Sequence, residues 1–347
     1  MTGLKRKLKT LRTGSPGFVL LQELLLARDG GRAALAAGAQ TYARLHGPAD
    51  GKEVARAMRS AYIHRGITPD EFIDFAFMDK SEREKAAFVS IEELLRVFSR
   101  GDKNTFPGDK YERYLLFPAC FHRELLCVRF DGSAEEAERV RRFLAAHGTF
   151  FLKPLKGTKG HGVQKLTAAQ APDLAALAAR APGGCLLEEP IVQGEELAHF
   201  HPGSVNTLRL ATVRDRSGDV HPLFAVLRIG AGDSVVDNVG AGGVVCLVDT
   251  ETGTVVTDGL NRHLYHARHP DTGVPFKGAR IPQWPELLAI AREAHATLPR
   301  QALIGWDFAW TTGGWDLVES NPAPSFASCQ ALAGKGIRPR LEAYGLL

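Results

Sequence analysis

The chain has 347 residues, of which 44% are hydrophobic and 24% are charged, as in an ordinary globular protein with two or three subdomains. Its 43 basic and 39 acidic residues give a net charge of +4, which excludes the strong overall field typical of nucleic-acid binding. A local basic cluster could still bind a phosphate-bearing small molecule. The five cysteines are scattered and form no CxxC pair, which argues against a disulfide framework or zinc site and for a reducing cytoplasm.

The chain begins with a basic stretch, MTGLKRKLKTLR, which lacks the apolar segment and cleavage site of a secretory signal. This stretch could contact an anionic membrane surface, but we favour a solvated, frayed terminus. No apolar run approaches the roughly 18 residues of a membrane span, so we expect none. The localisation that we predict is therefore cytoplasmic.

A helical scaffold is predicted for residues 1–105. Residues 17–45 combine Ala, Leu and Arg with a helical periodicity. The stretches 68–71 and 90–93 read as capping boxes, and each predicts the start of a helix. Nothing in this region has the pattern of a catalytic site.

A mixture of strands and helices is predicted from residue 106 onward. Ser133 caps a helix that ends at His147, where Gly148 stops it. The following stretches predict, in chain order, strands at 149–155 and 163–166, a helix at 167–181, strands at 185–192, 208–215 and 222–230, a hairpin at 243–259, a helix at 285–299, and strands at 305–312 and 315–321. This order is typical of an α+β or α/β enzyme.

The loop KGTKGHG, residues 156–162, lies between two predicted strands and follows Lys153. Glycines let a backbone approach oxyanions closely, and lysines supply positive charge, so the loop could bind phosphate. It matches neither a Walker loop nor a Rossmann GxGxxG pattern. A lysine-rich surface turn explains the loop about equally well.

Two acidic pairs, Glu188–Glu189 and Glu195–Glu196, follow a predicted strand. Such a segment suits a hinge between lobes, where backbone groups could bind an adenine edge and a carboxylate could bind ribose. For any single glutamate, an exposed acidic rim is the simpler interpretation.

Arg209 stands between two leucines at the start of a predicted strand and could face a cleft, where it would hold a phosphoryl group. Asn238 and the pair Gly242–Gly243 precede another strand, in a pattern that suits close approach of backbone and phosphate.

Asp307, Glu319 and Asn321 lie on the last two predicted strands, which a turn at 311–314 connects. If these strands pair, their three side-chain oxygens converge, and such hard ligands suit Mg²⁺ or Mn²⁺ rather than zinc. A site of this kind clamps the phosphates of a nucleotide. A merely satisfied polar cluster is less favoured, because two adjacent carboxylates repel without a cation or a proton.

Two further patterns carry less weight. His263, His266 and His269 have a spacing of three and could form a metal-binding helix face, but the prolines and glycine that follow favour a loop. Cys329 has no activating histidine pattern, so we expect a buried or loop cysteine rather than a nucleophile.

The ordered set of Lys110, Lys153, the glycine-rich loop, the acidic pairs, Arg209 and Asp307 with Glu319-x-Asn321 resembles the ATP-grasp superfamily. The stretches VNTLR, DNVGAGG, HPDTGVPFKGARIPQW and IGWDFAW resemble, more narrowly, its sugar-transfer-associated members. The resemblance covers roughly residues 65–340. It implies an α+β ATP-grasp fold whose small lobe, residues 106–200, and large lobe, residues 201–347, grip ATP.

The resemblance also implies roles for individual residues. Lys110 and Lys153 would contact the α- and β-phosphates, and Arg209 would stabilise the transferred phosphoryl group. One glutamate of each acidic pair would bind adenine or ribose. Asp307, Glu319 and Asn321 would hold two Mg²⁺ ions, with Mn²⁺ as an alternative. The remaining nucleotide-binding residues would be Lys156, Gly157, Lys159, Gly160, His161, Gly162, Asn238 and Gly242.

The usual reaction in that superfamily is ATP-dependent ligation through an acylphosphate. We therefore expect a ligase that joins a small-molecule carboxylate to an amine or hydroxyl acceptor in natural-product, peptide or polysaccharide biosynthesis, with no nucleic-acid partner. A phosphotransferase and a non-catalytic nucleotide-binding component are the alternatives, and Arg209 with the metal-binding set counts against the second. The helical first hundred residues depart from the standard ATP-grasp N-terminal domain, which leaves the acceptor open.

Overall fold

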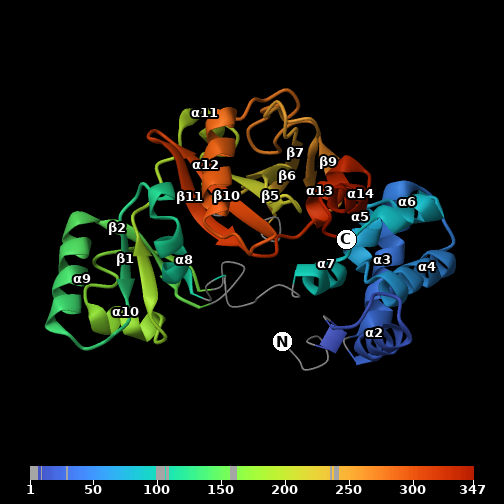
Figure 1. The fold of residues 1–347 in the computed structure, drawn as a ribbon, viewed down its shortest axis with the longest axis horizontal. Coiled ribbons are helices and arrows are strands. Elements are labelled where there is room, and N and C mark those ends of the chain that lie inside the picture. Colours follow the sequence, from blue (N-terminus) through green and yellow to red (C-terminus); the bar gives the residue numbers. More distant parts are fainter. Residues whose placement is uncertain are drawn as a thin grey trace.

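The computed structural model describes residues 7–8, 10–28, 30–98, 106, 109–156, 162–234, 237 and 242–347. It shows a mixed α+β molecule with a four-stranded and a seven-stranded antiparallel sheet. In Figure 1 the smaller sheet lies at one end of the molecule, the larger sheet in the middle, and the N-terminal helices at the other end. The predicted α+β class and the helical N-terminal region are confirmed.

The N-terminal region consists of helices, two of which begin at the predicted caps. Thr68 Oγ1 accepts a hydrogen bond from the Glu71 N–H, and the Glu71 carboxylate accepts one from the Thr68 N–H, so this capping box is complete. Ser90 Oγ accepts from the Glu93 N–H at 3.2 Å. The helices are α2 (Pro16–Arg28), α3 (Gly31–His46), α4 (Gly51–Arg65), α5 (Pro69–Asp74), the 3-10 helix η1 (Phe77–Asp79), α6 (Glu82–Ala87) and α7 (Ile91–Phe98).

The smaller sheet has the strand order β1-β4-β2-β3 and packs its own core against two helices. Ser133 caps the first helix as predicted. The second helix begins at Leu174 rather than at 167, because the Asp173 side chain caps it by accepting from the Ala176 N–H. The elements are β1 (Leu125–Val128), α9 (Ala134–Ala146), β2 (Thr149–Pro154), β3 (Gln164–Thr167), α10 (Leu174–Arg180) and β4 (Cys185–Glu188).

The larger sheet has the strand order β11-β10-β5-β6-β7-β8-β9. Helix α12 covers one face of it, where Leu287 and Ala291 share a core with Trp306 and Phe308. Its strands are β5 (Thr207–Arg214), β6 (Val220–Ile229), β7 (Val244–Val248), β8 (Gly259–Asn261), β9 (Leu264–His266), β10 (Leu303–Thr311) and β11 (Gly314–Asn321). The helices of this part are α11 (Glu195–Ala198), α12 (Trp284–Ala296), α13 (Ala327–Ala333) and α14 (Arg338–Ala343).

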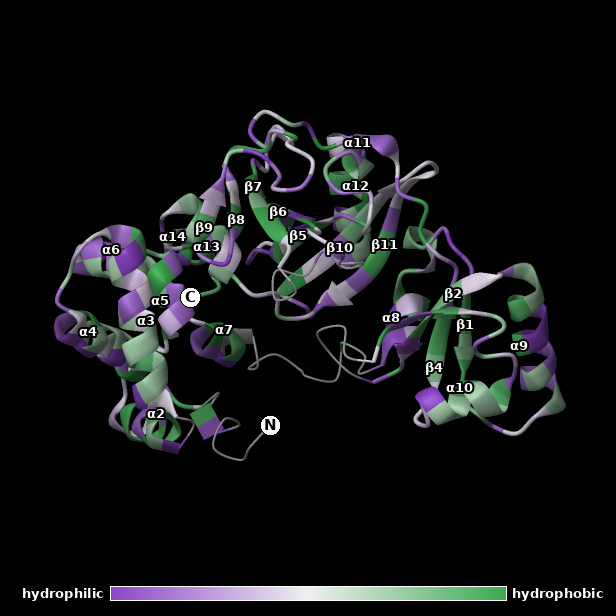
Figure 2. Ribbon diagram, turned by 180° about the vertical axis from the view of Figure 1, so that it is seen from behind, coloured by the Kyte–Doolittle hydropathy of each residue, from purple (hydrophilic) through white to green (hydrophobic). Residues whose placement is uncertain are grey.

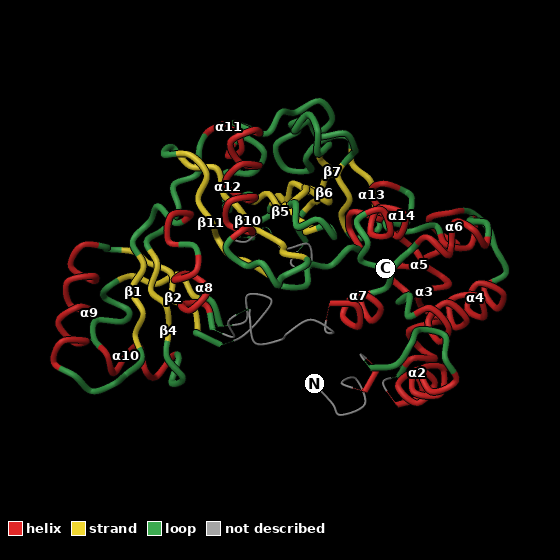
Figure 3. The backbone as a smooth tube through the Cα atoms, viewed as in Figure 1, coloured by secondary structure: helices red, strands yellow, loops and turns green. Residues whose placement is uncertain are grey.

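The N-terminal helices share a core with the opposite face of the larger sheet. Phe75, at the end of α5, belongs to the same buried cluster as Val213, Phe224 and Val226 of β5 and β6. Phe326 packs edge-to-face on Phe224, with ring centroids 5.6 Å apart. Figure 3 shows these helices gathered on the side of the molecule away from the smaller sheet. The N-terminal region is therefore part of the support of the larger sheet.

Two segments connect the lobes and pack with the larger sheet. One contains α8 (Lys110–Leu116) and the 3-10 helix η2 (Pro118–Cys120), and the Phe117 ring between them lies edge-on against Trp306 at 5.0 Å. Leu197 and Phe200 belong to the same core, and the lobe boundary at residue 200 stays a prediction. In Figure 2 strands β4 and β7 are hydrophobic and helices α4, α6 and α9 are largely hydrophilic, as expected for sheets covered by surface helices.

The three spaced histidines do not lie on a helix. Strands β8 and β9 form a hairpin whose two linking residues, Arg262 and His263, both have positive φ, 46° and 71°, as a tight hairpin turn requires. His263 contacts Asp74 on α5, and His269 bonds to the Gly230 carbonyl. The expectation of a non-helical segment holds.

All five cysteines are buried thiols, and burial raises the pKa of the Cys329 thiol. The prediction of a buried cysteine at this position is confirmed. Within the described residues, no helix has both the length and the apolar character needed to cross a bilayer.

Candidate functional site

Three neighbouring strands of the larger sheet each place a charged residue between two core residues. The charged residues are Arg209 on β5, Arg228 on β6 and Asp307 on β10. The residues before and after each of them pack in the core under α12; they are Leu208, Leu210, Leu227, Ile229, Trp306 and Phe308. Because side chains alternate along a strand, the three charged residues lie on the opposite face. Register places Asp307 directly beside Arg209.

Both arginines bind the same carboxylate. Arg209 donates to Asp307 through Nε at 2.6 Å and through Nη2 at 2.5 Å, and Arg228 Nη1 donates to it at 2.8 Å. Arg228 Nη2 also donates to Asp237 at 2.9 Å, and Asp237 accepts from the Thr207 hydroxyl. We refer to Arg209, Arg228, Asp237 and Asp307 as the charged cluster. Its planar, bidentate geometry is the strong form of a charge-assisted hydrogen bond.

Burial and ion pairing shift the pKa values in the charged cluster in opposite directions. Burial alone would raise the pKa of Asp307, but the Arg209 and Arg228 guanidiniums hold it below the usual carboxylate value. Burial lowers the pKa of Arg209, and pairing with Asp307 outweighs this and raises it. For Asp237 burial dominates, and its pKa is raised despite Arg228. Asp307 is therefore held as a carboxylate between two cations.

The predicted metal-binding residues come together across paired strands. Glu319 on β11 lies opposite Asp307, and Asn321 lies opposite Gly305. Asn321 Nδ2 donates to Glu319 Oε1 at 3.1 Å, and that oxygen lies 3.9 Å from Arg209 Nη2. The strand pairing on which the metal prediction depended is therefore present.

The donor set fits Mg²⁺ better than a metal that needs many protein ligands. Among the described residues there is no cluster of three or more His, Cys, Asp or Glu side chains placed to hold an ion. Asp307, Glu319 and Asn321 provide two carboxylates and one amide, and Mg²⁺ usually takes one or two carboxylates and completes its shell with water and phosphate. Asp307 already accepts from two arginines, whereas the Glu319 side chain is 46% exposed and more open to an ion.

A second buried ionic network joins the two sheets. Lys153 Nζ on β2 lies 2.7 Å from Glu188 Oε2 on β4. Arg123 donates to the same oxygen at 2.9 Å through Nη2, and through Nη1 to Asp316 Oδ1 at 2.8 Å and the Leu317 carbonyl at 2.9 Å. Burial alone would raise the pKa of Glu188, but Lys153 and Arg123 hold it low. The network fixes the predicted phosphate-binding lysine relative to β11.

Lys110 lies at the start of α8, between the lobes (Figure 1). Its ammonium donates to the Pro154 carbonyl at 2.8 Å, next to Lys153 in sequence. Burial lowers the pKa of Lys110, nearby Glu319 raises it, and Lys153 and Arg113 lower it further. Lys153 and Glu319 therefore both lie close enough to Lys110 to shift its pKa.

The other acidic candidates lie near the surface. Glu189 accepts a hydrogen bond from the Glu124 N–H, and Glu196 accepts one from Trp310 Nε1 at 2.7 Å. Glu195 is exposed. Their predicted adenine and ribose contacts stay predictions.

The glycine-rich candidates are described only in part. Lys156 is exposed, and Gly162 has a φ of 77° and lies where a Cβ would come within 2.9 Å of the Pro154 ring. Gly242 has a φ of 97°. The other predicted residues of these two loops lie outside the described residues; they are Gly157, Lys159, Gly160, His161 and Asn238.

Sequence analysis did not identify Arg228, Asp237 or Arg123. Arg228 was detectable, because it stands between Leu227 and Ile229 just as Arg209 stands between two leucines. Asp237 begins the stretch DNVGAGG, which carries part of the family resemblance, but we inferred no role for its carboxylate. Arg123 lies in a connecting segment, where neither periodicity nor a motif distinguishes it. Their roles depend on contacts made across the fold.

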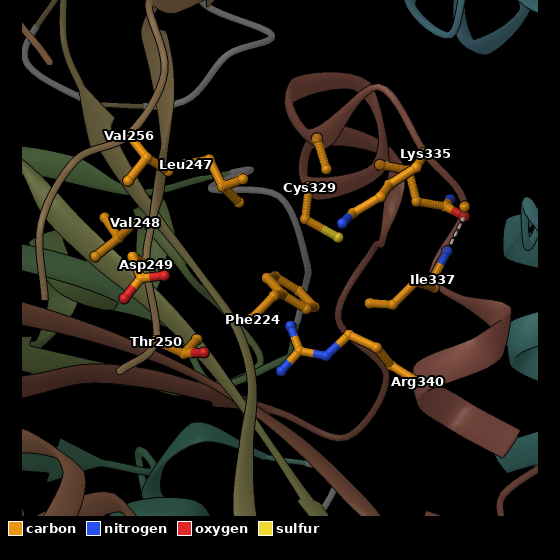
Figure 4. Close-up of a pocket in the computed structure, with 13 residues that line it drawn as sticks. Phe224, Leu247, Val248, Asp249, Thr250, Val256, Cys329, Lys335, Ile337 and Arg340 are labelled. Carbon is orange, nitrogen blue, oxygen red and sulfur yellow. Dashed lines mark hydrogen bonds between the residues drawn. The ribbon is translucent and has the colours of Figure 1, made fainter. Parts of the chain in front are cut away.

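A separate pocket of about 220 Å³ lies between β6–β7 and α13–α14 (Figure 4). Phe224, Leu247 and Cys329 are among its lining residues, and the Lys335 and Arg340 side chains extend into it. None of the predicted site residues lines it. It is distinct from the charged cluster.

Residues 173–345 match the family model described as sugar-transfer associated ATP-grasp. Over these residues the chain belongs to that family. The matched span includes the charged cluster together with Glu319 and Asn321, and it begins after Lys110 and Lys153. The chain has the α+β ATP-grasp fold, preceded by a helical N-terminal region. No curated protein matches the sequence.

Several solved structures resemble this ATP-grasp chain at low identity. The ATP-grasp ligase PsnB complexed with a minimal precursor is 14% identical with a TM-score of 0.43, over 74% of this chain and 69% of that one. D-alanyl-alanine synthetase A from Vibrio cholerae is 14% identical with a TM-score of 0.41, over 69% and 60%. N5-carboxyaminoimidazole ribonucleotide synthetase from Thermotoga maritima is 13% identical with a TM-score of 0.40, over 74% and 51%.

Proposed function

We propose that the chain is an ATP-dependent ligase that activates a small-molecule carboxylate as an acylphosphate and transfers the acyl group to an amine or hydroxyl. The observation that carries the proposal is the pairing of β6, β5, β10 and β11, which sets Arg209 and Arg228 beside Asp307 and brings Arg209 near Glu319. Two cations next to two hard-ligand carboxylates suit a transferred phosphoryl group better than simple nucleotide storage.

ATP would lie between the lobes with its phosphates toward the charged cluster. Lys110 and Lys153 would contact the α- and β-phosphates, and Asp307, Glu319 and Asn321 would hold two Mg²⁺ ions, or Mn²⁺. When bound, these ions would supply positive charge that offsets the charge on the transferred phosphoryl group. One glutamate from each acidic pair would contact adenine or ribose.

In the first step a carboxylate oxygen of the substrate forms a bond to the γ-phosphorus, and the bond from phosphorus to ADP breaks. Arg209 and Arg228 would bind the equatorial oxygens of that phosphoryl group. Because Asp307 already fixes the planes of both guanidiniums, little reorganisation is needed as charge develops. In the second step the acceptor nitrogen or oxygen attacks the acyl carbon, inorganic phosphate leaves, and the acceptor loses a proton.

Arg123 acts at a distance from these atoms. It ties Glu188 on the smaller sheet to Asp316 on β11, and Glu188 in turn holds the Lys153 ammonium. We therefore assign Arg123 a positioning role, which keeps Lys153 at a fixed place relative to the charged cluster.

The decisive test uses hydroxylamine as the acceptor. The protein is incubated with ATP, Mg²⁺, hydroxylamine and a panel of carboxylic acids, and hydroxamate and phosphate are measured. A ligase yields hydroxamate and phosphate in equal amounts with at least one acid. A phosphorylated product without hydroxamate would instead identify a phosphotransferase.

A matched pair of variants links the reaction to the site. Arg209→Met removes a cation of the charged cluster, whereas Arg216→Met removes an exposed arginine from the turn between β5 and β6. We expect hydroxamate formation to be lost in the first variant and retained in the second. Equal activity of both would refute the assignment of the site.

A further inference from the structure

Helix α2 (Pro16–Arg28) is apolar on two sides. Phe18, Leu21 and Leu25 are buried in a small core of their own with Leu8. A helix that buries one apolar side normally turns polar residues to solvent. Here Leu20 and Leu24, one turn apart, are instead 63% and 52% exposed.

The exposed side of α2 continues into a hollow of about 370 Å³. Leu20 and Leu24 line it together with Leu11 and Gly17, so the apolar surface extends beyond the helix onto the segment that precedes it. Lys7 and Thr10 also line the hollow, and Lys7 contributes a positive charge to it. We refer to Lys7, Leu11, Leu20 and Leu24 as the α2 surface.

The charge of this part of the chain has a single sign. Residues 1–22 contain five lysines and arginines and no aspartate or glutamate, a formal charge of +5, whereas the whole chain has only +4. Lys7 and Arg12 are exposed. The first acidic residue is Glu23, whose carboxylate pairs with Arg59 of α4. The exposed leucines therefore share the hollow with Lys7, in a stretch of sequence that contains no acidic residue before Glu23.

The α2 surface lies far from the charged cluster. Helix α2 packs mainly on α3 and α4. In Figure 1 it lies at the outer corner of the N-terminal region, across the molecule from the smaller sheet. Changes to its exposed residues can therefore be made without touching the proposed nucleotide site.

We propose that the α2 surface docks the protein peripherally on an anionic lipid surface. Leu20, Leu24 and Leu11 would enter the boundary between head groups and acyl chains, and the basic residues would bind the lipid phosphates. Exposed leucines beside exclusively positive charge favour an anionic lipid surface over the two alternatives. An apolar partner protein would need no such charge, and a second copy of the chain would bring the same positive charge to the contact. This proposal takes up the membrane contact that the sequence left as the less favoured alternative; residues 1–6 and 9 of the basic stretch lie outside the described residues.

The test is co-sedimentation of the full chain with vesicles of phosphatidylcholine alone and of phosphatidylcholine mixed with phosphatidylglycerol. We expect binding to the mixed vesicles only, weakened by high salt. Lys7→Gln should reduce the partition coefficient about fivefold, since each basic residue near an anionic surface contributes about 1 kcal/mol. The double change Leu20→Gln and Leu24→Gln should reduce it by at least about tenfold.

A matched control distinguishes binding through the α2 surface from nonspecific hydrophobic binding. Val192 is 68% exposed and lies in the segment between β4 and α11, so Val192→Gln removes a comparably exposed apolar side chain elsewhere and should leave vesicle binding unchanged. Circular dichroism and the melting temperature should not change in the leucine variant, because both leucines are exposed in the folded chain.

Three results would overturn the proposal. The first is equal binding to neutral and anionic vesicles, and the second is binding that the leucine changes do not weaken. The third is a dimer, detected by light scattering, that dissociates in the leucine variant, because it would identify a second copy of the chain as the occupant.

Discussion

The larger sheet has a polar network on each face, and the two networks differ in charge. Under α12, Trp306 Nε1 donates to Thr212 Oγ1 at 2.8 Å, Thr212 is bonded to His295 Nδ1 at 2.7 Å, and His295 Nε2 is bonded to the Gln301 carbonyl at 2.8 Å. On the opposite face Arg209 binds Asp307. Both networks use β5 and β10.

The difference in charge assigns the neutral network to stability and the charged cluster to ligand binding. The one under α12 is neutral and buried, so each of its groups has found a partner and none is left for a ligand. The charged cluster keeps ionised groups beside Glu319, which is half exposed, and ionised groups of this kind can exchange partners when phosphate or metal arrives. If this comparison is right, changes on one face should affect catalysis and changes on the other should affect only stability.

The largest effect should come from Asp307→Asn. This change removes the charge that two partly buried arginines share, and breaking such a pair on one side costs about 3 to 5 kcal/mol of unfolding free energy. Urea unfolding at neutral pH measures the loss, and activity should also disappear. A variant as stable as the parent would show that the arginines are solvated rather than held by Asp307.

Arg209→Met should lower the rate of ATP-dependent phosphate release by a factor of about 100 to 1,000, equivalent to roughly 3 to 4 kcal/mol of transition-state stabilisation. Asp307 keeps Arg228 as a partner, so the folded state should survive. Steady-state kinetics and a melting curve on the same preparation test both halves. A change confined to the KM for ATP would point to binding alone.

The third effect concerns pH and belongs to the neutral network. Burial, with Arg214 nearby, lowers the pKa of His295 to about 4. The unfolded chain therefore binds more protons between about pH 6.5 and 4, so stability from this group is complete above 6.5 and is lost as pH falls to 4, by roughly 3 kcal/mol. Urea unfolding across this range measures the loss.

A control variant isolates this pH effect. His295→Gln should flatten the slope between pH 6.5 and 4. The depressed carboxylates, Asp307 and Glu188, contribute stability that is lost only as pH falls below about 4, because their unfolded pKa values lie near that point. A steep slope that persists in the variant would assign the effect to other groups.

The smallest effect should come from Thr212→Val on the same face as His295. It deletes a buried hydroxyl that accepts from Trp306 and is bonded to His295, at a cost of about 1 to 3 kcal/mol. Catalytic rate per folded molecule should stay within about twofold to threefold of the parent. A loss of rate comparable with that of Arg209→Met would contradict the hypothesis that this face affects only stability.

Local patterns were enough to predict most elements of this fold. The cap at Thr68, the cap at Ser133 and the strands around Arg209 and Asp307 depend on residues a few positions apart, and all of them are present. The same patterns located the residues of the proposed metal site, because alternation along β10 and β11 fixes which side chains share a face. The glycine-rich loop and Asn238 lie outside the described residues, and their roles stay predictions.

Sequence patterns could not predict which side chains pair across the fold. Asp307 binds an arginine 98 positions away, and Arg123 joins carboxylates 65 and 193 positions away. Periodicity also predicted α2 as a helix but not that Leu20 and Leu24 would stay uncovered. The sequence by itself determined the elements, their order and the chemistry available on each strand, since short-range sterics and hydrogen bonds set these. Only the tertiary structure decided which charges meet and which apolar faces stay open, because strand register and helix packing depend on contacts between distant segments.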